Sequence, residues 1–174
     1  MNEPKHISEK ELEALHDEAF KWALSCCRFD HEKARDVMQN CYLEILEQRA
    51  VFYGESSLRT WLFSVIRHLA LRQSKKQYSF EGLKTKLSLF ENTDSEGSDI
   101  VGQVNGKQVK DLVLKSIDAL PLKQRQIVEL VYYRGFTIAE AATVIGVGLG
   151  SARTHLHRAK KTLERELLSI RIHK

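Results

Sequence analysis

The chain has 174 residues, of which 43% are hydrophobic and 29% charged, a balance typical of folded globular proteins. It has no apolar run near the ~20 residues that cross a bilayer, and no apolar signal-peptide core. We therefore expect a soluble, cytoplasmic protein without membrane insertion. Its three cysteines lack CxxC spacing and its seven histidines form no zinc pattern, so we expect no metal site and no cofactor.

The N-terminal part of the chain shows the apolar spacing of consecutive helices. Ser8 and Glu11 form an S-x-x-E capping box at the start of the first helix. A second helix is expected from about Glu32 to Arg49, with Asp30 as its N-cap. A third is expected from about Leu58 to Lys76. Its predicted buried face consists of Leu58, Leu62, Val65 and Leu69.

The composition changes in residues 79–107, which contain 3 basic and 5 acidic residues and little that could form a buried face. This stretch predicts an acidic flexible linker between domains at 8–78 and 108–174. Because no long stretch alternates apolar and polar residues, sheet is not expected. The predicted fold class is all-α, with two small helical domains joined by the linker.

The C-terminal domain is basic, since residues 108–174 contain 12 Lys and Arg against 6 Asp and Glu. Such a concentration of positive charge indicates a nucleic-acid partner, although a solvated basic helix would show it too. Pro121 is placed to start a helix, and Arg134–Phe136 to end it. The residues expected to pack this helix are Ile127, Val128, Leu130, Val131 and Tyr132.

Residues 137–147 have the build of a DNA-binding helix-turn-helix. Thr137 and Glu140 form a second capping box. Ala141 stands where the two helices must approach closely, and Gly146 where the chain turns and a positive φ costs little. This combination favours DNA binding over a merely structural helix pair.

The second helix of this motif is expected to begin near Gly148–Ser151 and to enter a major groove with its N-terminal half. Ala152, Leu156, Ala159 and Leu163 are spaced to face inward. The outward residues Arg153, Thr154, His157 and Arg158 suit base edges. Lys160 and Lys161 are better placed for phosphates, which give affinity without sequence choice.

This segment resembles the promoter −35-reading domain of extracytoplasmic-function sigma factors. That family usually opens with Leu-Pro-x-x-x-Arg, as in Leu120–Arg125, and closes with a Gly-Thr-Val-x-Ser-x-x-x-Arg-Ala pattern, here at Gly150–Ala159. The sequence departs from the pattern at Gly148, where Ser or Pro is more common, and at Ala152, where Val is usual. The resemblance implies that the outward residues of the second helix bind the −35 element.

Glu32–Leu43 is similar to the helix by which sigma factors grip the β′ clamp of RNA polymerase. Asp36 and Gln39 match its D-x-x-Q, a spacing that puts a carboxylate and an amide on one helix face. Alone, this pair is more typical of a solvated face. With the resemblance, it implies a core-polymerase-binding set of Asp36, Gln39, Asn40 and Leu43.

Ser57–His68 looks like the family's −10-melting helix. In such a helix an aromatic ring and basic groups hold an unpaired strand. The implied −10 DNA-binding set is Arg59, Trp61, Arg67, His68, Arg72, Lys75 and Lys76. Trp61 could instead be a core residue, which would leave base capture to the loop around Phe52–Ser56. His68 replaces the usual Asn and Arg72 a frequent Asp, so the −10 base preference stays open.

The resemblance implies an alternative sigma factor, a subunit without catalytic residues that directs core RNA polymerase to promoters. Its expected partners are promoter DNA, the β′ clamp and β flap of the polymerase, and an anti-sigma factor. The alternative is a helix-turn-helix transcriptional regulator that acts without being a polymerase subunit. That alternative predicts stable DNA binding by the protein alone and a signal-sensing N-terminal domain.

Overall fold

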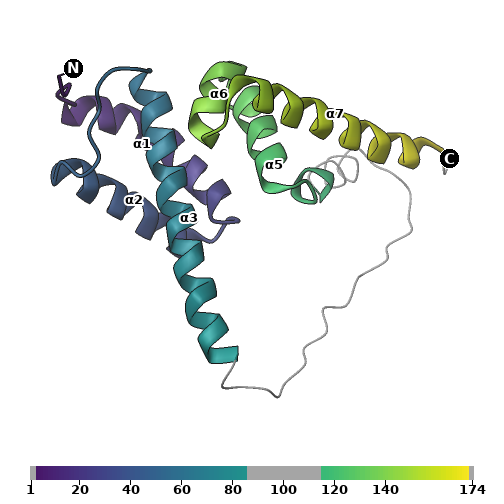
Figure 1. The fold of residues 1–174 in the computed structure, drawn as a ribbon, viewed down its shortest axis with the longest axis horizontal. Coiled ribbons are helices and arrows are strands. Elements are labelled where there is room, and N and C mark those ends of the chain that lie inside the picture. The colour runs from purple at the N-terminus through teal and green to yellow at the C-terminus, as the bar shows by residue number, and fades with distance from the viewer. Residues whose placement is uncertain (1–2, 86–114, 173–174) are drawn as a thin grey trace. The chain divides into compact units, whose positions relative to one another are not determined.

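The computed structural model describes residues 3–85 and 115–172, and within these ranges it contains helices and turns but no strand (Figure 1). The chain divides into two compact units. The N-terminal unit contains α1 (Glu9–Cys26), α2 (His31–Leu46) and α3 (Leu58–Thr85). The C-terminal unit contains α5 (Leu122–Val128), the π-helix η1 (Glu129–Tyr133), α6 (Ile138–Ile145) and α7 (Leu149–Ile172). The predicted all-α fold with two helical regions is confirmed.

The N-terminal helices begin at the predicted caps. The backbone N–H of Ser8 donates to Oε2 of Glu11 at 2.9 Å, and the side chain of Ser8 accepts from the backbone N–H of Glu11. Asp30 Oδ1 accepts from the backbone N–H of Lys33 at 3.1 Å. Each bond satisfies a donor that the first helical turn would otherwise leave unpaired.

Trp22 on α1 is the centre of the N-terminal core. It is fully buried and stacks on Phe63 of α3, with ring centroids 5.7 Å apart and planes 13° from parallel. Its indole N–H donates to the backbone carbonyl of Phe63 at 3.0 Å. The buried indole therefore has its hydrogen bond, as a Trp in a core requires. Since α1, α2 and α3 pack against one another in pairs, this contact fixes the unit.

The buried face of α3 is broader than predicted. Leu62 and Leu69 are buried as expected, but Leu58 and Val65 are only half-buried. The side chains of Phe63, Ile66 and Ala70 are buried in their place. The reason is that α3 packs against both α1 and α2, so the apolar stripe must serve two neighbours. The helix also continues to Thr85, beyond its predicted end. The rest of the expected linker lies outside the described residues.

In the C-terminal unit, α5 passes directly into the π-helix η1. The wider turn of a π-helix changes which residues face the core. Ile127 and Leu130 are buried, whereas Tyr132 is 55% exposed. The prediction that Tyr132 packs in the core was therefore wrong. The helix ends near Arg134 as expected, where the guanidinium pairs with Glu129 at 2.6 Å.

We expect Phe63→Ala to lower the free energy of unfolding of the N-terminal unit by about 3–5 kcal/mol, because it removes the partner of Trp22 and leaves a cavity. Urea titration followed by the fluorescence of Trp22 and Trp61, both in this unit, measures this loss. Leu46→Ala is the control, since Leu46 is 77% exposed and its loss should change stability by less than about 0.5 kcal/mol. Equal effects of the two changes would contradict the assigned core.

Candidate nucleic-acid interface

The helix-turn-helix is built as predicted. The backbone N–H of Thr137 donates to Oε2 of Glu140 at 2.8 Å, and the backbone N–H of Glu140 donates to Oγ1 of Thr137 at 3.2 Å. Ala141 is fully buried where α6 meets its neighbours. Gly146 ends α6 with φ +66°, a conformation that a side chain would strain. The turn therefore sets the direction in which α7 leaves.

The long helix α7 separates an apolar side from a polar one. Ala152, Leu156 and Ala159 are buried against the rest of the unit. The six residues predicted to bind the −35 element are all exposed on α7: Arg153, Thr154, His157, Arg158, Lys160 and Lys161. Thr154 donates its hydroxyl to the carbonyl of Gly150 at 3.0 Å, which leaves the oxygen free only to accept.

Lys160 contacts an aromatic ring, which the sequence did not indicate. Its Nζ lies 5.4 Å from the centroid of the Tyr132 ring, a cation–π distance. The exposed Tyr132 thus orients a lysine on the same helix as the predicted base-reading residues. No sequence pattern could show this, because the tyrosine reaches the surface only through the π-helix.

The exposed face of α2 carries the predicted polymerase-binding set. All four residues are exposed: Asp36, Gln39, Asn40 and Leu43. The side chain of Leu43 is 43% exposed to solvent. The opposite face is buried against α1 and α3, and it consists of Ala34, Val37, Met38 and Cys41. The exposed apolar surface continues to Leu46 at the end of the helix, a residue that sequence reasoning missed. The predicted helix ran on to about Arg49, whereas α2 ends at Leu46.

On α3, the first two residues of the predicted −10 set contact other parts of the protein. The guanidinium of Arg59 pairs with Glu18 of α1, with Nε donating to Oε2 at 2.9 Å, and also lies 5.5 Å from the ring centroid of Phe63. Trp61 is half-buried, and its ring lies 5.4 Å from that of Phe52 in the preceding loop. Arg59 therefore helps to join α1 to α3, and Trp61 joins α3 to the loop.

The rest of the −10 set becomes more exposed along α3. Arg67 is half-buried, and burial lowers the pKa of its guanidinium. His68, Arg72 and Lys75 are exposed, and Arg72 also pairs with Glu44 of α2 at 3.2 Å. The side chain of Lys76 lies outside the described residues. The structure thus brings a basic stretch of α3 to the surface, and its Arg72 pairs with Glu44 of α2.

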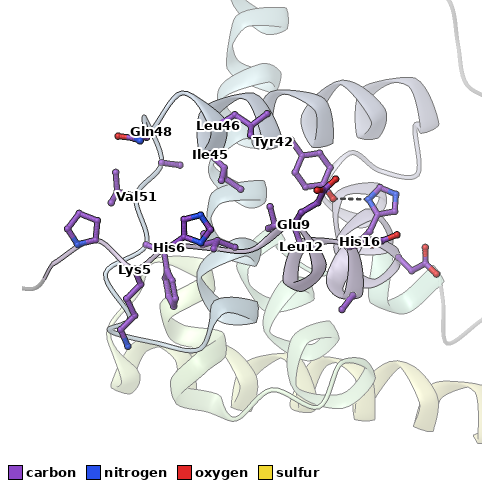
Figure 2. A pocket seen from close by; sticks show the side chains of 17 residues that line it. Lys5, His6, Glu9, Leu12, His16, Tyr42, Ile45, Leu46, Gln48 and Val51 are labelled. Carbon is purple, nitrogen blue, oxygen red and sulfur yellow. Dashed lines mark hydrogen bonds between the residues drawn. The ribbon is translucent and has the colours of Figure 1, made fainter.

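A groove of about 1210 Å³ lies between the N-terminal arm (residues 3–7), α1, the end of α2 and the loop after it (Figure 2). Its apolar lining includes Leu12, Ile45 and Val51. His16 and Tyr42 share a hydrogen bond of 2.7 Å between Nδ1 and the phenolic oxygen. Sequence reasoning missed the arm, because the arm is held by a contact with the loop after α2, which is distant in the chain.

Within the two described ranges, no group of three or more His, Cys, Asp or Glu side chains is arranged to hold a metal ion. No helix of these ranges is long and apolar enough to cross a membrane. Cys41 is fully buried, and burial raises the pKa of its thiol to about 12. Burial also raises the pKa of Cys27 to about 11.

Both helical units match known protein families. Residues 12–79 match the family model of sigma-70 region 2, and residues 110–163 match that of sigma-70 region 4. The ECF RNA polymerase sigma factor SigX of Bacillus subtilis is 24% identical over 145 residues, which cover 82% of this chain and 74% of SigX. SigL of Mycobacterium tuberculosis is 27% identical over 163 residues, 87% of this chain and 86% of SigL. The chain belongs to the extracytoplasmic-function sigma factors.

Solved sigma factor structures share the fold. The sigma factor RpoE, in complex with the anti-sigma factor NepR from Bartonella quintana, aligns with a TM-score of 0.65 at 22% identity. That alignment covers 91% of this chain and 95% of RpoE. CnrH, in complex with the cytosolic domain of CnrY, aligns with a TM-score of 0.58 at 18% identity over 92% of this chain and 87% of CnrH.

As an alternative sigma factor, the protein is a non-catalytic subunit of RNA polymerase that directs transcription initiation. The hypothesis of a helix-turn-helix regulator outside the polymerase is set aside, because the N-terminal unit matches sigma-70 region 2.

We expect Cys41 and Cys27 to resist iodoacetamide near pH 8 in the folded sigma factor and to react in urea, because only the thiolate attacks. Because both pKa values are raised by folding, the two thiols ionise near pH 9 in the unfolded chain but only at higher pH in the folded one. The free energy of unfolding should therefore fall as the pH rises from about 9 toward 11 and 12. Mass spectrometry of the labelled peptides measures the rates. Fast labelling of folded Cys41 would contradict the burial found here.

Proposed function

We propose that this sigma factor binds the polymerase and promoter DNA through three exposed helix faces, on α2, α3 and α7. Region 2, assigned to residues 8–78, binds core polymerase through α2 and holds the −10 strand with α3 and the loop before it. Region 4, assigned to residues 108–174, reads the −35 element with α7, and residues 79–107 join the two. The observation that carries the proposal is that the polar face of α2 and that of α7 each lie opposite a buried one.

The α2 face suits the β′ clamp of the polymerase. Asp36 and Gln39 lie about one turn apart and can accept charge-assisted and neutral hydrogen bonds from basic groups of a partner helix. Leu43 and Leu46 add exposed apolar surface beyond this polar pair. A polar pair beside an apolar patch supplies both orientation and affinity, which a lasting subunit contact requires.

The α7 face suits a major groove. Arg153, His157 and Arg158 extend from the N-terminal half of α7, where base contacts are made in this motif. An Arg can bond the O6 and N7 atoms of guanine with both arms of its guanidinium. Lys160 and Lys161 lie further along and would contact phosphates, which hold the helix in position.

For the −10 strand, we propose that the rings of Trp61 and Phe52 form an aromatic platform under the loop. His68, Arg72 and Lys75 contact the DNA backbone. The exposed Arg72 can keep Glu44 on one edge and bond a phosphate with its remaining donors. Arg59 would have to exchange Glu18 for a phosphate, and Arg67 and Lys76 complete the proposed set. Unpaired bases stack on aromatic rings at a gain of about 1–3 kcal/mol each.

We further propose that region 4 contacts the β flap of the polymerase and that an anti-sigma factor binds this protein in the cytoplasm. Support for the anti-sigma partner comes from two similar folds, since RpoE is in complex with the anti-sigma factor NepR and CnrH with the cytosolic domain of CnrY.

We expect the double change Asp36→Ala/Gln39→Ala to weaken binding to core RNA polymerase at least about tenfold. Loss of one member of a desolvated charge pair costs about 2 kcal/mol or more. Titration of fluorescently labelled protein with core enzyme measures the dissociation constant, and circular dichroism checks the fold. Glu13→Ala, which removes an exposed carboxylate from α1, should bind like the wild type. Unchanged binding by the double variant would rule out the assigned face.

We expect Arg158→Ala to reduce transcription from a promoter selected out of random-sequence DNA by the wild-type holoenzyme. Loss of a base contact should cost about 1–3 kcal/mol and relax selectivity at one −35 position. Lys161→Ala is the matched comparison, because loss of a phosphate contact should weaken all −35 sequences alike. Reduced core binding in the Arg158 variant would count against the assigned faces.

A further inference from the structure

The N-terminal arm holds the loop between α2 and α3. The backbone N–H of Lys5 donates to the carbonyl of Phe52 at 2.7 Å. A Cβ placed on Gly54 would clash with Cε of Lys5, so the lysine side chain crosses directly over this glycine. Gly54 has φ +74°, which also favours glycine at this position. The arm therefore bonds to the loop and covers its turn.

This contact connects the arm to the residues proposed to hold the −10 strand. The carbonyl that Lys5 binds belongs to Phe52, whose ring contacts Trp61 of α3. The next residue, Tyr53, is 44% exposed on the same loop. Fixing the loop in advance lowers the conformational entropy that strand binding would otherwise cost.

Charge adds a second role for Lys5. The lysine is exposed, and no ion pair of its ammonium is found within residues 3–85 and 115–172. Glu55 is the acidic residue among residues 51–57, and it would repel an approaching DNA strand. A cation over Gly54 offsets that repulsion and is placed to meet a phosphate.

We propose that the N-terminal arm is part of the surface that holds the unwound promoter strand. The backbone N–H of Lys5 fixes the loop through Phe52, and its ammonium contacts a phosphate of the DNA. This inference rests on the −10 role proposed above for the loop and α3. It makes Lys5 a further DNA-binding residue, one that lies outside residues 12–79, which match region 2.

The test uses holoenzyme assembled from core polymerase and the full chain, with the selected promoter carrying 2-aminopurine in the −10 strand. The equilibrium extent of melting is measured over a series of salt concentrations. Lys5→Ala removes the ammonium but keeps the N–H, Lys5→Arg keeps both, and Lys5→Pro removes both. Lys21→Ala on α1 is the control for loss of one exposed positive charge.

We expect Lys5→Ala to reduce the slope of log K against log salt by about 0.7, the value for one contact to a single strand. Lys5→Arg and Lys21→Ala should keep the wild-type slope. Lys5→Pro should melt the promoter less than Lys5→Ala at every salt concentration, because the loop is also released. Core binding should be unchanged in all four variants.

An unchanged slope in Lys5→Ala would overturn the phosphate contact, and equal melting by the Ala and Pro variants would overturn the fixing of the loop. An equal loss in Lys21→Ala would also overturn the assignment, since the effect would then reflect net charge alone. Lys75→Ala, measured in parallel, tests the −10 role of α3. If Lys75→Ala reduces the slope and Lys5→Ala does not, the arm proposal fails alone. If neither changes it, the −10 proposal fails as well.

Discussion

The N-terminal unit depends on the contact between Trp22 and Phe63. Stacking and the indole hydrogen bond hold α1 to α3 at one point of a fully buried core. Because α2 packs against both helices that this contact joins, the side of α2 that faces them is buried and the other side is left in solvent. Core packing therefore leaves a row of exposed residues on α2, which consists of Asp36, Gln39, Asn40, Leu43 and Leu46.

In the C-terminal unit, a tight turn separates the buried face of a helix from its exposed face. Gly146 turns the chain with a positive φ, and small or apolar residues of α7 then fit against the unit. The polar side of α7 must face outward, which leaves its arginines, histidine and lysines available to DNA. The π-helix that exposes Tyr132 modifies this surface by bringing an aromatic ring to Lys160.

Several basic residues of region 2 serve the fold as well as the surface. Arg59 pairs with Glu18 and Arg72 with Glu44, so these side chains join helices of the unit. Their ion pairs hold α1 and α2 to α3. In the proposed −10 role, an anionic strand would compete with these internal partners, so its binding would be coupled to the packing of the three helices.

The sequence by itself determined the helices, their caps, the helix-turn-helix and the polar faces of α2 and α7. These features depend on local spacing, such as Ser8 with Glu11 and Thr137 with Glu140, and on the 3.6-residue period. Only the tertiary structure decided which α3 residues are buried, how the π-helix turns Tyr132 outward, and that Lys5 reaches Phe52. The burial on α3 and the contact of Lys5 depend on residues far apart in the chain, and the π-helix departs from the 3.6-residue period, so no helical pattern in the sequence records them.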